Sequence, residues 1–150
     1  MERTLVLLKP DAIERGLTGA ILARLEARGL KIVGLRMLRM DMPLARRHYA
    51  AHEGKPFFNG LVDFITSGPL VAVVLEGRNA LDVVRQTMGP TDSAKAPPGT
   101  IRGDWGVDIG RNLIHGSDSP EAAAREISLF FGKDGVLSYD RALDPWITEP

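Results

Sequence analysis

The chain has 150 residues, of which 44% are hydrophobic, so it is long enough to fill one core and too short for two ordinary domains. Nineteen basic and nineteen acidic side chains cancel, which argues against binding of nucleic acid or an anionic membrane through an overall positive field. The absence of cysteine excludes disulfides and thiolate metal sites, no apolar run approaches the roughly 20 residues of a membrane-spanning helix, and the cytoplasm is the expected location.

The first part of the chain predicts two strands with a helix between them. Residues 3–9 are apolar in the middle, which is typical of a strand buried on both faces. Residues 18–28 predict an amphipathic helix that Thr18 can cap. Residues 30–40 predict the second strand, in which Gly34 marks a bend or a close approach.

Two helical pieces follow in residues 44–67, separated by residues 54–56. The loop between them is expected to project His52, Lys55 and Phe57 outward. On spacing alone, His52 would be a helix-surface residue and Phe57 would be half of a core pair of phenylalanines.

Residues 70–76 contain no polar interruption and predict a central strand, followed by a helix that Asn79 caps. Arg85 falls off the apolar stripe of that helix near its C-terminal turn, where a cation is favourable in any case. Residues 89–103 carry three prolines and three glycines, so they predict a long ordered loop without regular structure. Such loops are often functional.

The segment of residues 111–131 places a histidine between a short apolar run and a strongly marked helix start. Residues 112–114 predict a short buried strand that ends at His115, and a polar turn follows. Ser119 is a good N-cap for the next helix, which Gly132 ends. A histidine in this position could be a nucleophile, a general base, a metal ligand or only a hydrogen-bonded turn residue.

Several strings of the sequence resemble one enzyme family. The string NLIHGSDS, residues 112–119, resembles the active-site signature of nucleoside diphosphate kinases. A strand that runs into Lys-Pro-Asp at Lys9 and the segment HYAAHEGKPFF are similar to further parts of that family. The family's phosphate-binding loop matches residues 85–102, although Ser93 stands where the family commonly has proline. The resemblance covers nearly the entire chain.

The resemblance implies roles for the catalytic residues. His115 would accept a phosphoryl group, Glu126 would hold its ring, and Tyr49 would support it. From the residues alone, Glu126 would be a solvated helix-face residue and Tyr49 a helix-surface residue. Lys9 would contact the ribose and the phosphates, whereas alone it is an ordinary solvated strand end.

The remaining roles concern nucleotide binding. Phe57 would stack on the base, Asn112 would contact the ribose with Lys9, and His52 would lie near the phosphates. The polyphosphate would be bound by Arg85, Thr91 and Arg102. Two guanidinium groups and a hydroxyl suit a phosphate chain, because this chemistry needs fixed donors.

The order of elements predicts a mixed α/β layer domain covering residues 1–150. Spacing alone would permit a parallel doubly wound sheet. The resemblance implies instead an α/β (α+β) fold, a ferredoxin-like sandwich with a four-stranded antiparallel sheet covered by helices and residues 44–67 as an insertion.

The implied function is a nucleoside diphosphate kinase, which moves the terminal phosphate of a nucleoside triphosphate to His115 and then to a nucleoside diphosphate. It would accept purine, pyrimidine, ribo- and deoxyribonucleotides and help to balance nucleotide pools. No carboxylates appear at metal-ligand spacing, so Mg²⁺ is expected to arrive with the nucleotide and no metal site of the protein's own is expected.

The C-terminal tail, residues 132–150, retains Trp146 and Ile147 and resembles the longer-tailed hexameric members of the family. A homo-hexamer is therefore expected, with a tetramer as the alternative. The rival class is a non-catalytic nucleotide-binding protein of the same fold, which would usually have lost a motif residue. This chain keeps them all, and nucleic-acid binding is disfavoured by the zero net charge.

Overall fold

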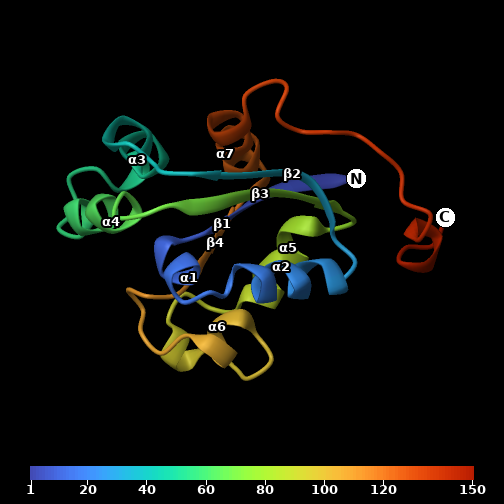
Figure 1. Cartoon of the computed structure of the whole chain (residues 1–150), viewed down its shortest axis with the longest axis horizontal. Coiled ribbons are helices and arrows are strands. Elements are labelled where there is room, and N and C mark those ends of the chain that lie inside the picture. The colour runs from blue at the N-terminus through green and yellow to red at the C-terminus, as the bar shows by residue number, and fades with distance from the viewer.

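The computed structural model describes residues 1–150 and contains one four-stranded antiparallel sheet (Figure 1). Its strands are β1 (Glu2–Leu8), β2 (Lys31–Leu38), β3 (Leu70–Gly77) and β4 (Ile114–Gly116), in the spatial order β2-β3-β1-β4. All neighbouring pairs are antiparallel. The predicted ferredoxin-like arrangement is confirmed, and the parallel doubly wound sheet is excluded.

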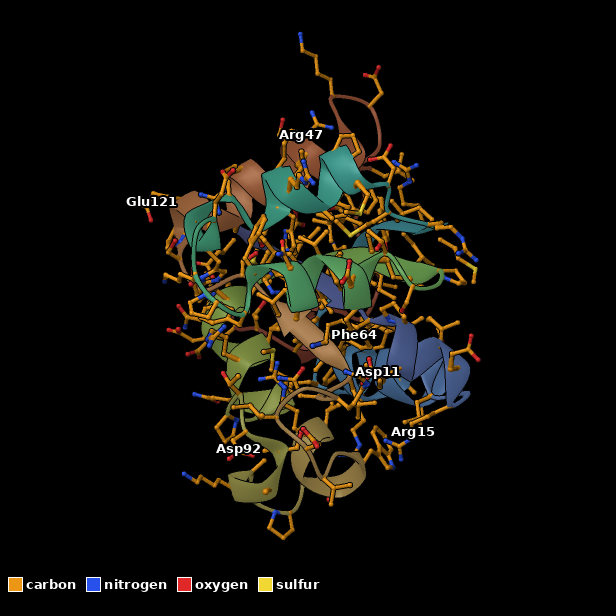
Figure 2. All side chains as sticks on the ribbon, turned by 90° about the vertical axis from the view of Figure 1, so that its left-hand side faces the viewer. Asp11, Arg15, Arg47, Phe64, Asp92 and Glu121 are labelled. Carbon is orange, nitrogen blue, oxygen red and sulfur yellow. The ribbon has the colours of Figure 1, made fainter.

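Helices cover both faces of this sheet (Figure 1). One face carries α1 (Pro10–Glu14), α2 (Thr18–Ala27), α5 (Ala80–Met88) and α6 (Ile101–Trp105). The other face carries α3 (Met42–His48), α4 (Phe58–Ile65) and α7 (Pro120–Phe131). The short 3₁₀ helices are η1 (Ala50–His52), η2 (Ser93–Lys95) and η3 (Asp144–Trp146). Figure 2 shows the layers from the side, with Arg47 of α3 near the top, Glu121 of α7 at the upper left and Asp92, next to η2, at the lower left. None of the helices has the length and apolar character needed to cross a membrane.

The central strands explain the two-sided core. Leu5 and Leu7 of β1 pack toward α3, α4 and α7, whereas Val6 and Leu8 pack toward α1, α2, α5 and α6. Successive side chains of a strand point to opposite faces, so a strand covered on both sides needs an unbroken apolar run. The central position predicted for residues 70–76 is confirmed in the same way, because β3 lies between β2 and β1.

Gly34 of β2 has both predicted properties. The register of β2 against β3 shifts between Ile32 and Gly34, which is a bulge in the edge strand. A Cβ atom at Gly34 would lie 3.1 Å from the ring of Phe131, so α7 approaches the strand closely there. The absence of a side chain at Gly34 therefore lets helix α7 pack close to the sheet.

One predicted helix cap is wrong, and a second is correct in position only. The N-cap of α2 is Leu17 rather than Thr18, and no side chain caps this helix. Asn79 does occupy the N-cap of α5, but with left-handed backbone (φ 56°) and without a side-chain cap bond. Instead, the backbone N–H of Leu81 donates to Oε1 of Glu2 at 2.7 Å. The capping group of α5 therefore comes from a residue that is distant in the sequence. A local sequence pattern does not reveal such a partner.

The loop predicted for residues 89–103 contains more regular structure than expected. It includes η2 and the start of α6 at Ile101. The hydroxyl of Thr100 accepts from the N–H of Gly103 at 2.9 Å and caps α6. Ser93, at the position where proline was expected, is buried within η2. Helix α6 has five residues, too few to show helical periodicity.

Strand β4, which carries His115, also differs from its prediction. Strand β4 begins at Ile114, and His115 lies in its middle rather than at its end. Leu113 has a φ of 72°, which no strand residue adopts, so the expected strand at residues 112–114 is wrong. The sequence pattern does not predict helix α1, because Pro10 directly follows an apolar run and marks a strand end, although proline also suits the first turn of a helix.

Candidate active site

A cavity of about 690 Å³ lies between the α3–α4 segment and the chain from α5 to β4. All ten residues expected at the site line it: Lys9, Tyr49, His52, Phe57, Arg85, Thr91, Arg102, Asn112, His115 and Glu126. His48, Phe64, Asp118 and Arg125 line it too and were not expected. A second cavity of about 730 Å³ lies against the C-terminal tail and contains none of the ten. The sequence-derived site therefore coincides with one cavity of the structure.

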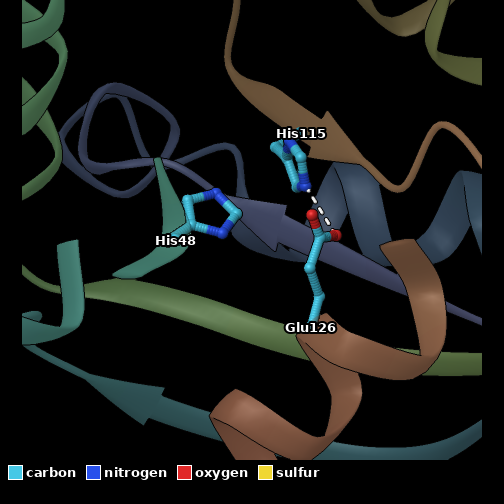
Figure 3. A group of neighbouring side chains, drawn as sticks. All are labelled: His48, His115 and Glu126. Carbon is cyan, nitrogen blue, oxygen red and sulfur yellow. Dashed lines mark hydrogen bonds and ion pairs between the residues drawn. The ribbon is translucent and has the colours of Figure 1, made fainter. Parts of the chain in front are cut away.

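His115 and Glu126 both line this cavity, and their side chains are hydrogen-bonded to each other (Figure 3). Nε2 of His115 lies 3.0 Å from Oε1 of Glu126 on α7. The hydroxyl of Ser117 donates to the same oxygen at 2.7 Å. Burial alone would raise the pKa of Glu126, but the hydrogen bonds from His115 and Ser117 and the charge of His115 outweigh burial and hold that pKa below its ordinary value. Glu126 is therefore a buried carboxylate.

This bond fixes the chemistry of the imidazole ring. A carboxylate accepts hydrogen bonds, so the ring nitrogen that faces it, Nε2 of His115, carries the proton. In the neutral imidazole the other nitrogen, Nδ1, then keeps its lone pair. The ring of His115 is thus presented in the tautomer in which Nδ1 carries the free lone pair.

Helix α7 owes its position to a cap that the sequence predicted. The hydroxyl of Ser119 accepts from the N–H of Ala122 at 3.0 Å, and Pro120 is the first helical residue. Gly132 ends the helix with a φ of 62°. Because β4 and α7 are joined by a short capped turn, the carboxylate of Glu126 returns to the ring of His115.

The backbone before β4 makes a tight turn centred on Leu113. This residue has a φ of 72°, and the N–H of Ile114 donates to the carbonyl of Asn112 at 2.8 Å. A γ-turn with positive φ is strained for a residue that has a side chain. It is held from both sides, because the N–H of Leu113 donates to Oδ2 of Asp11 at 3.0 Å and its carbonyl accepts from the N–H of Lys9 at 2.9 Å.

Arg102 binds the same turn. Its guanidinium donates to the carbonyls of Asn112 at 3.1 Å, Ile114 at 2.5 Å and Gly89 at 3.0 Å. The side chain is 4% exposed. Burial, and then the charge of Arg85, lower the pKa of Arg102 to about 10, so it remains charged at neutral pH. An arginine has five N–H donors, so Arg102 can hold the backbone and still present donors to a phosphate.

Lys9 and Asn112 form a second anchored pair. The ammonium group of Lys9 donates to Oδ1 of Asn112, and Nδ2 of Asn112 donates to the carbonyl of Thr91 at 2.9 Å. Burial lowers the pKa of Lys9 to about 8, against the influence of Asp11 and together with that of Arg102. The structure thus brings the expected ribose and phosphate contacts into one hydrogen-bonded group.

Arg85 extends from α5 to the backbone of strand β4 and the turn that follows it. Its guanidinium donates to the carbonyl of Gly116 at 3.1 Å and to that of Ser117 at 3.5 Å. Both expected phosphate-binding arginines are therefore tied to the backbone next to His115. Their position relative to the imidazole is fixed by main-chain bonds.

The expected base-binding residues lie at the opening of the cavity. Phe57 is 51% exposed, and its ring lies 5.4 Å from that of His52 and 5.8 Å from the ammonium group of Lys55. As expected, the loop presents Phe57 and Lys55 to solvent, while His52 is half-buried. Phe57 is therefore not part of a core pair.

The expected support of His115 by Tyr49 is not direct in the structure. The ring packed against His115 is that of His48, at 4.8 Å between centroids and almost perpendicular, at 82°. Tyr49 packs on His48 at 4.7 Å, and burial raises the pKa of Tyr49 to about 12.

His48 was missed by the sequence analysis. It is 8% exposed, and neither ring nitrogen has a hydrogen-bond partner. Burial, and then the neighbouring His115, lower the pKa of His48 to about 3, so the ring is neutral. The available signal was its spacing of three from Ala45, the other buried residue of α3.

Comparisons with known proteins agree on one family. A family model described as Nucleoside diphosphate kinase matches residues 2–136. The nucleoside diphosphate kinase of Carboxydothermus hydrogenoformans is 56% identical over 99% of this chain and 100% of its own length. That of Thermomicrobium roseum is 58% identical over 98% of this chain and 99% of its own.

Solved structures give the same result. A halophilic nucleoside diphosphate kinase from Halobacterium salinarum in complex with CDP superposes with a TM-score of 0.96 at 56% identity, covering 99% of each chain. A nucleoside diphosphate kinase family protein from Babesia bovis has a TM-score of 0.96 at 40% identity, covering 99% of this chain and 100% of its own.

Proposed function

This chain belongs to the nucleoside diphosphate kinase family and is a phosphotransferase, and we propose that His115 carries the phosphoryl group between the two nucleotides. The observation that carries the proposal is the 3.0 Å bond from Nε2 of His115 to the buried carboxylate of Glu126. This bond leaves the lone pair on Nδ1. Nδ1 is thus the proposed acceptor atom.

The reaction proceeds in two half-reactions. In the first, Nδ1 of His115 attacks the γ-phosphorus, the bond from that phosphorus to the bridging oxygen breaks, and the nucleoside diphosphate leaves. In the second, a β-phosphate oxygen of a different nucleoside diphosphate attacks the phosphorus on Nδ1 and releases the imidazole. Phosphorylation draws electrons from the ring, and the carboxylate of Glu126 stabilises the Nε2 proton that becomes more acidic.

The phosphates are assigned to the anchored cations. Arg85, Arg102 and Lys9 supply positive charge, and Thr91, which lines the same cavity, supplies a hydroxyl. Their main-chain and side-chain bonds support this role, because transfer of a phosphoryl group depends on fixed positions and on neutralisation of spread charge.

Magnesium is proposed to enter with the nucleotide. Only two carboxylates, Asp118 and Glu126, line the cavity, and Glu126 is engaged by His115 and Ser117. Mg²⁺ keeps several waters and commonly binds through substrate phosphates plus one or two carboxylates. The residues present fit such an ion, with Asp118 as the available carboxylate. The ion would neutralise phosphate charge.

Broad nucleotide specificity follows from the contacts that the chain can offer. Phe57 presents a ring face and no hydrogen-bond donors at its edge, and stacking is worth roughly 1 to 3 kcal/mol for any base. Lys9 and Asn112 are proposed to contact the 3′-hydroxyl of the ribose, which deoxyribonucleotides retain. A change of base or loss of the 2′-hydroxyl should therefore cost little.

A homo-hexamer is the proposed assembly. Exposed apolar side chains occur on the edge strand β2, at Leu35 (54%) and Met37 (61%), and separately before β4, at Val107 (82%) and Ile109 (59%). Two distinct surfaces are what a closed hexamer with dihedral symmetry requires. Trp146 of the tail is 89% exposed and available to a neighbour. Light scattering of the full chain and of a variant lacking residues 141–150 tests the hexamer against a tetramer. The cytoplasm is the proposed location, because both substrates are solutes of that compartment.

The assignment of His115 is tested by replacing it with alanine. We expect phosphate exchange to fall by more than about a thousandfold, because a covalent intermediate can no longer form. Intact mass spectrometry should show one phosphoryl group on the native protein after incubation with ATP and none on His115→Ala. Lys133→Ala changes an exposed residue outside the cavity; it is the control and should retain the adduct. Wild-type exchange by His115→Ala would refute the assignment.

A further inference from the structure

Three metal-ligating side chains from separate elements meet beside the catalytic histidine (Figure 3). They are His48 of α3, His115 of β4 and Glu126 of α7, and their ligand atoms all lie within 4.8 Å of one another. His48 is 8% exposed, lines the cavity and has no hydrogen-bond partner at either nitrogen. A buried imidazole without partners is uncommon and calls for a ligand that would satisfy it.

We propose that His48, His115 and Glu126 bind one Zn²⁺ ion, and that this ion switches phosphoryl transfer off by moving the proton of His115 from Nε2 to Nδ1. The binding of zinc stands on the geometry of these side chains alone. Its inhibitory effect rests on the proposed role of Nδ1 as the phosphoryl acceptor.

The distances are close to those that zinc requires. Two Zn–ligand bonds of about 2.0 to 2.1 Å at the tetrahedral angle hold their ligand atoms about 3.3 Å apart. Nε2 of His115 and Oε1 of Glu126 are already 3.0 Å apart. A ligand atom of His48 lies within 4.8 Å of a ligand atom of each of the other two residues, so its ring needs to approach them by about 1.5 Å. No hydrogen bond of the His48 ring would break during this shift.

The set of ligands selects zinc over magnesium. Two imidazole nitrogens and one carboxylate are a common zinc set, with the fourth position left to water in an open cavity. Mg²⁺ requires oxygen ligands in octahedral geometry, so the ion carried by the nucleotide does not compete for this site. Metal binding needs neutral imidazoles, and both nitrogens of the buried His48 ring are without a hydrogen-bond partner.

Inhibition follows from the tautomer of a single ring. A neutral imidazole has one proton and one nitrogen lone pair. When Nε2 of His115 gives its lone pair to zinc, the proton resides on Nδ1, which can no longer attack phosphorus. Glu126 leaves its hydrogen bond with the ring and becomes a ligand. The nucleotide contacts at Phe57 and Arg102 are untouched, so phosphorylation should stop while nucleotide affinity is retained.

Zinc binding is tested first, without nucleotide. Calorimetric titration of the wild-type chain with ZnCl₂ in a non-chelating buffer should give one ion per chain. His48→Gln should weaken the affinity at least tenfold, whereas His52→Gln, which changes another histidine of the cavity, should leave it unchanged. X-ray absorption of the zinc-loaded wild type should report two imidazole ligands. Because this measurement uses the wild-type chain, it tests the site even if His48→Gln folds poorly. Fewer than two imidazoles, or equal affinities for both variants, would overturn the site.

The tautomer effect is tested second. Wild-type protein with saturating zinc should form no phosphoryl adduct with excess Mg·ATP and should recover the adduct when a chelator removes the zinc. ADP affinity should change by less than about threefold between the zinc-free and zinc-loaded forms. Zinc that binds as above but leaves the adduct intact would refute the inhibition. A metal-free protein that never forms the adduct would instead refute the role of His115, while the zinc titration would still stand.

Discussion

The two sides of the active-site cavity are built in opposite ways. The cavity floor consists of Arg102 and Asn112, which line the cavity, together with the buried turn at Leu113 next to them. These residues are at most 4% exposed and are tied together by hydrogen bonds to the main chain. The cavity rim consists of Phe57, which lines the cavity, and the neighbouring Lys55; both are exposed, and their side chains make ring contacts of more than 5 Å. Hydrogen bonds hold the side chains of the proposed phosphate site, whereas the side chains of the proposed base site make ring contacts only.

This difference fits the demands of the two contacts. Phosphoryl transfer depends on donors that are fixed before the reaction, because reorganisation during the step would raise the barrier. Stacking on a base needs only an available ring face. The floor therefore should respond to substitution in both stability and catalysis, and the rim should respond in nucleotide binding alone.

The largest effect is expected for Arg102→Lys. Lysine keeps the charge but cannot donate to three carbonyls in a fork, so the free energy of unfolding should fall by about 3 kcal/mol and exchange by at least about a hundredfold. Urea denaturation and coupled kinetics measure both. Arg125→Lys is the control, since its side chain is 63% exposed and should change stability by less than about 0.5 kcal/mol. Equal stability of the two variants would mean that the floor is not held by Arg102.

Asp11→Ala should have the next largest effect. It leaves the N–H of Leu113 without its acceptor, so the strained turn should be destabilised by about 2 kcal/mol, and kcat should fall more than KM rises. Asp11→Asn keeps an acceptor oxygen and should stay within about 0.5 kcal/mol of wild type. If both variants behave alike, the charge of Asp11 matters rather than its hydrogen bond.

The pH dependence of stability extends the comparison to His48. Its pKa is about 3 in the folded chain and 6.5 ordinarily, so the unfolded state binds the additional proton as the pH falls below 6.5. The contribution of the neutral His48 ring to stability is therefore fully present above pH 6.5. Below that pH, the free energy of unfolding falls by up to about 1.4 kcal/mol per pH unit. Below about pH 4.5, Glu126 adds to the loss, because its pKa is lowered as well. Between pH 4.5 and 6.5, the free energy of unfolding should depend less steeply on pH for His48→Gln than for wild type. The difference in slope should correspond to about one bound proton. An unchanged slope would place the proton uptake elsewhere.

The smallest effect on stability is expected at the rim. Phe57→Ala should raise KM about tenfold for every nucleotide through lost stacking, with kcat retained. The free energy of unfolding should stay within about 0.5 kcal/mol of wild type, since the side chain is 51% exposed. Lys55→Ala is the neighbouring control and should leave KM nearly unchanged. A fall in stability comparable to that of Asp11→Ala would erase the distinction between rim and floor.

Much of this site could be predicted from the sequence, because its residue types are individually recognisable. His115, Lys9 and the arginines belong to strings with a known pattern, and they line one cavity as expected. The floor was not predictable in the same way. A leucine gives no local signal of positive φ, so the turn at Leu113 could not be inferred. The carbonyl partners of Arg102 depend on tertiary packing.

The same limit applies to the fold. Unbroken apolar runs predicted β1 and β3, since both faces of these strands are covered. Helices α1 and α6 have five residues each and show no periodicity. The cap of α5 by Glu2 and the packing of His48 on His115 join residues far apart in the chain, so no window of sequence contains them.

The pairing of β4 with β1 also governs how the enzyme must fold. His115 is the register partner of Leu7, and the bond between Lys9 and Asn112 joins residues separated by 103 positions. Contacts of such long range are slow to form, because closing the intervening loop costs entropy before any contact compensates for it. A partly folded chain with only the β1–β3–β2 sheet therefore has no nucleophile in place. Catalytic activity recovered during refolding should follow the slowest kinetic phase, well after the bulk of secondary structure has returned.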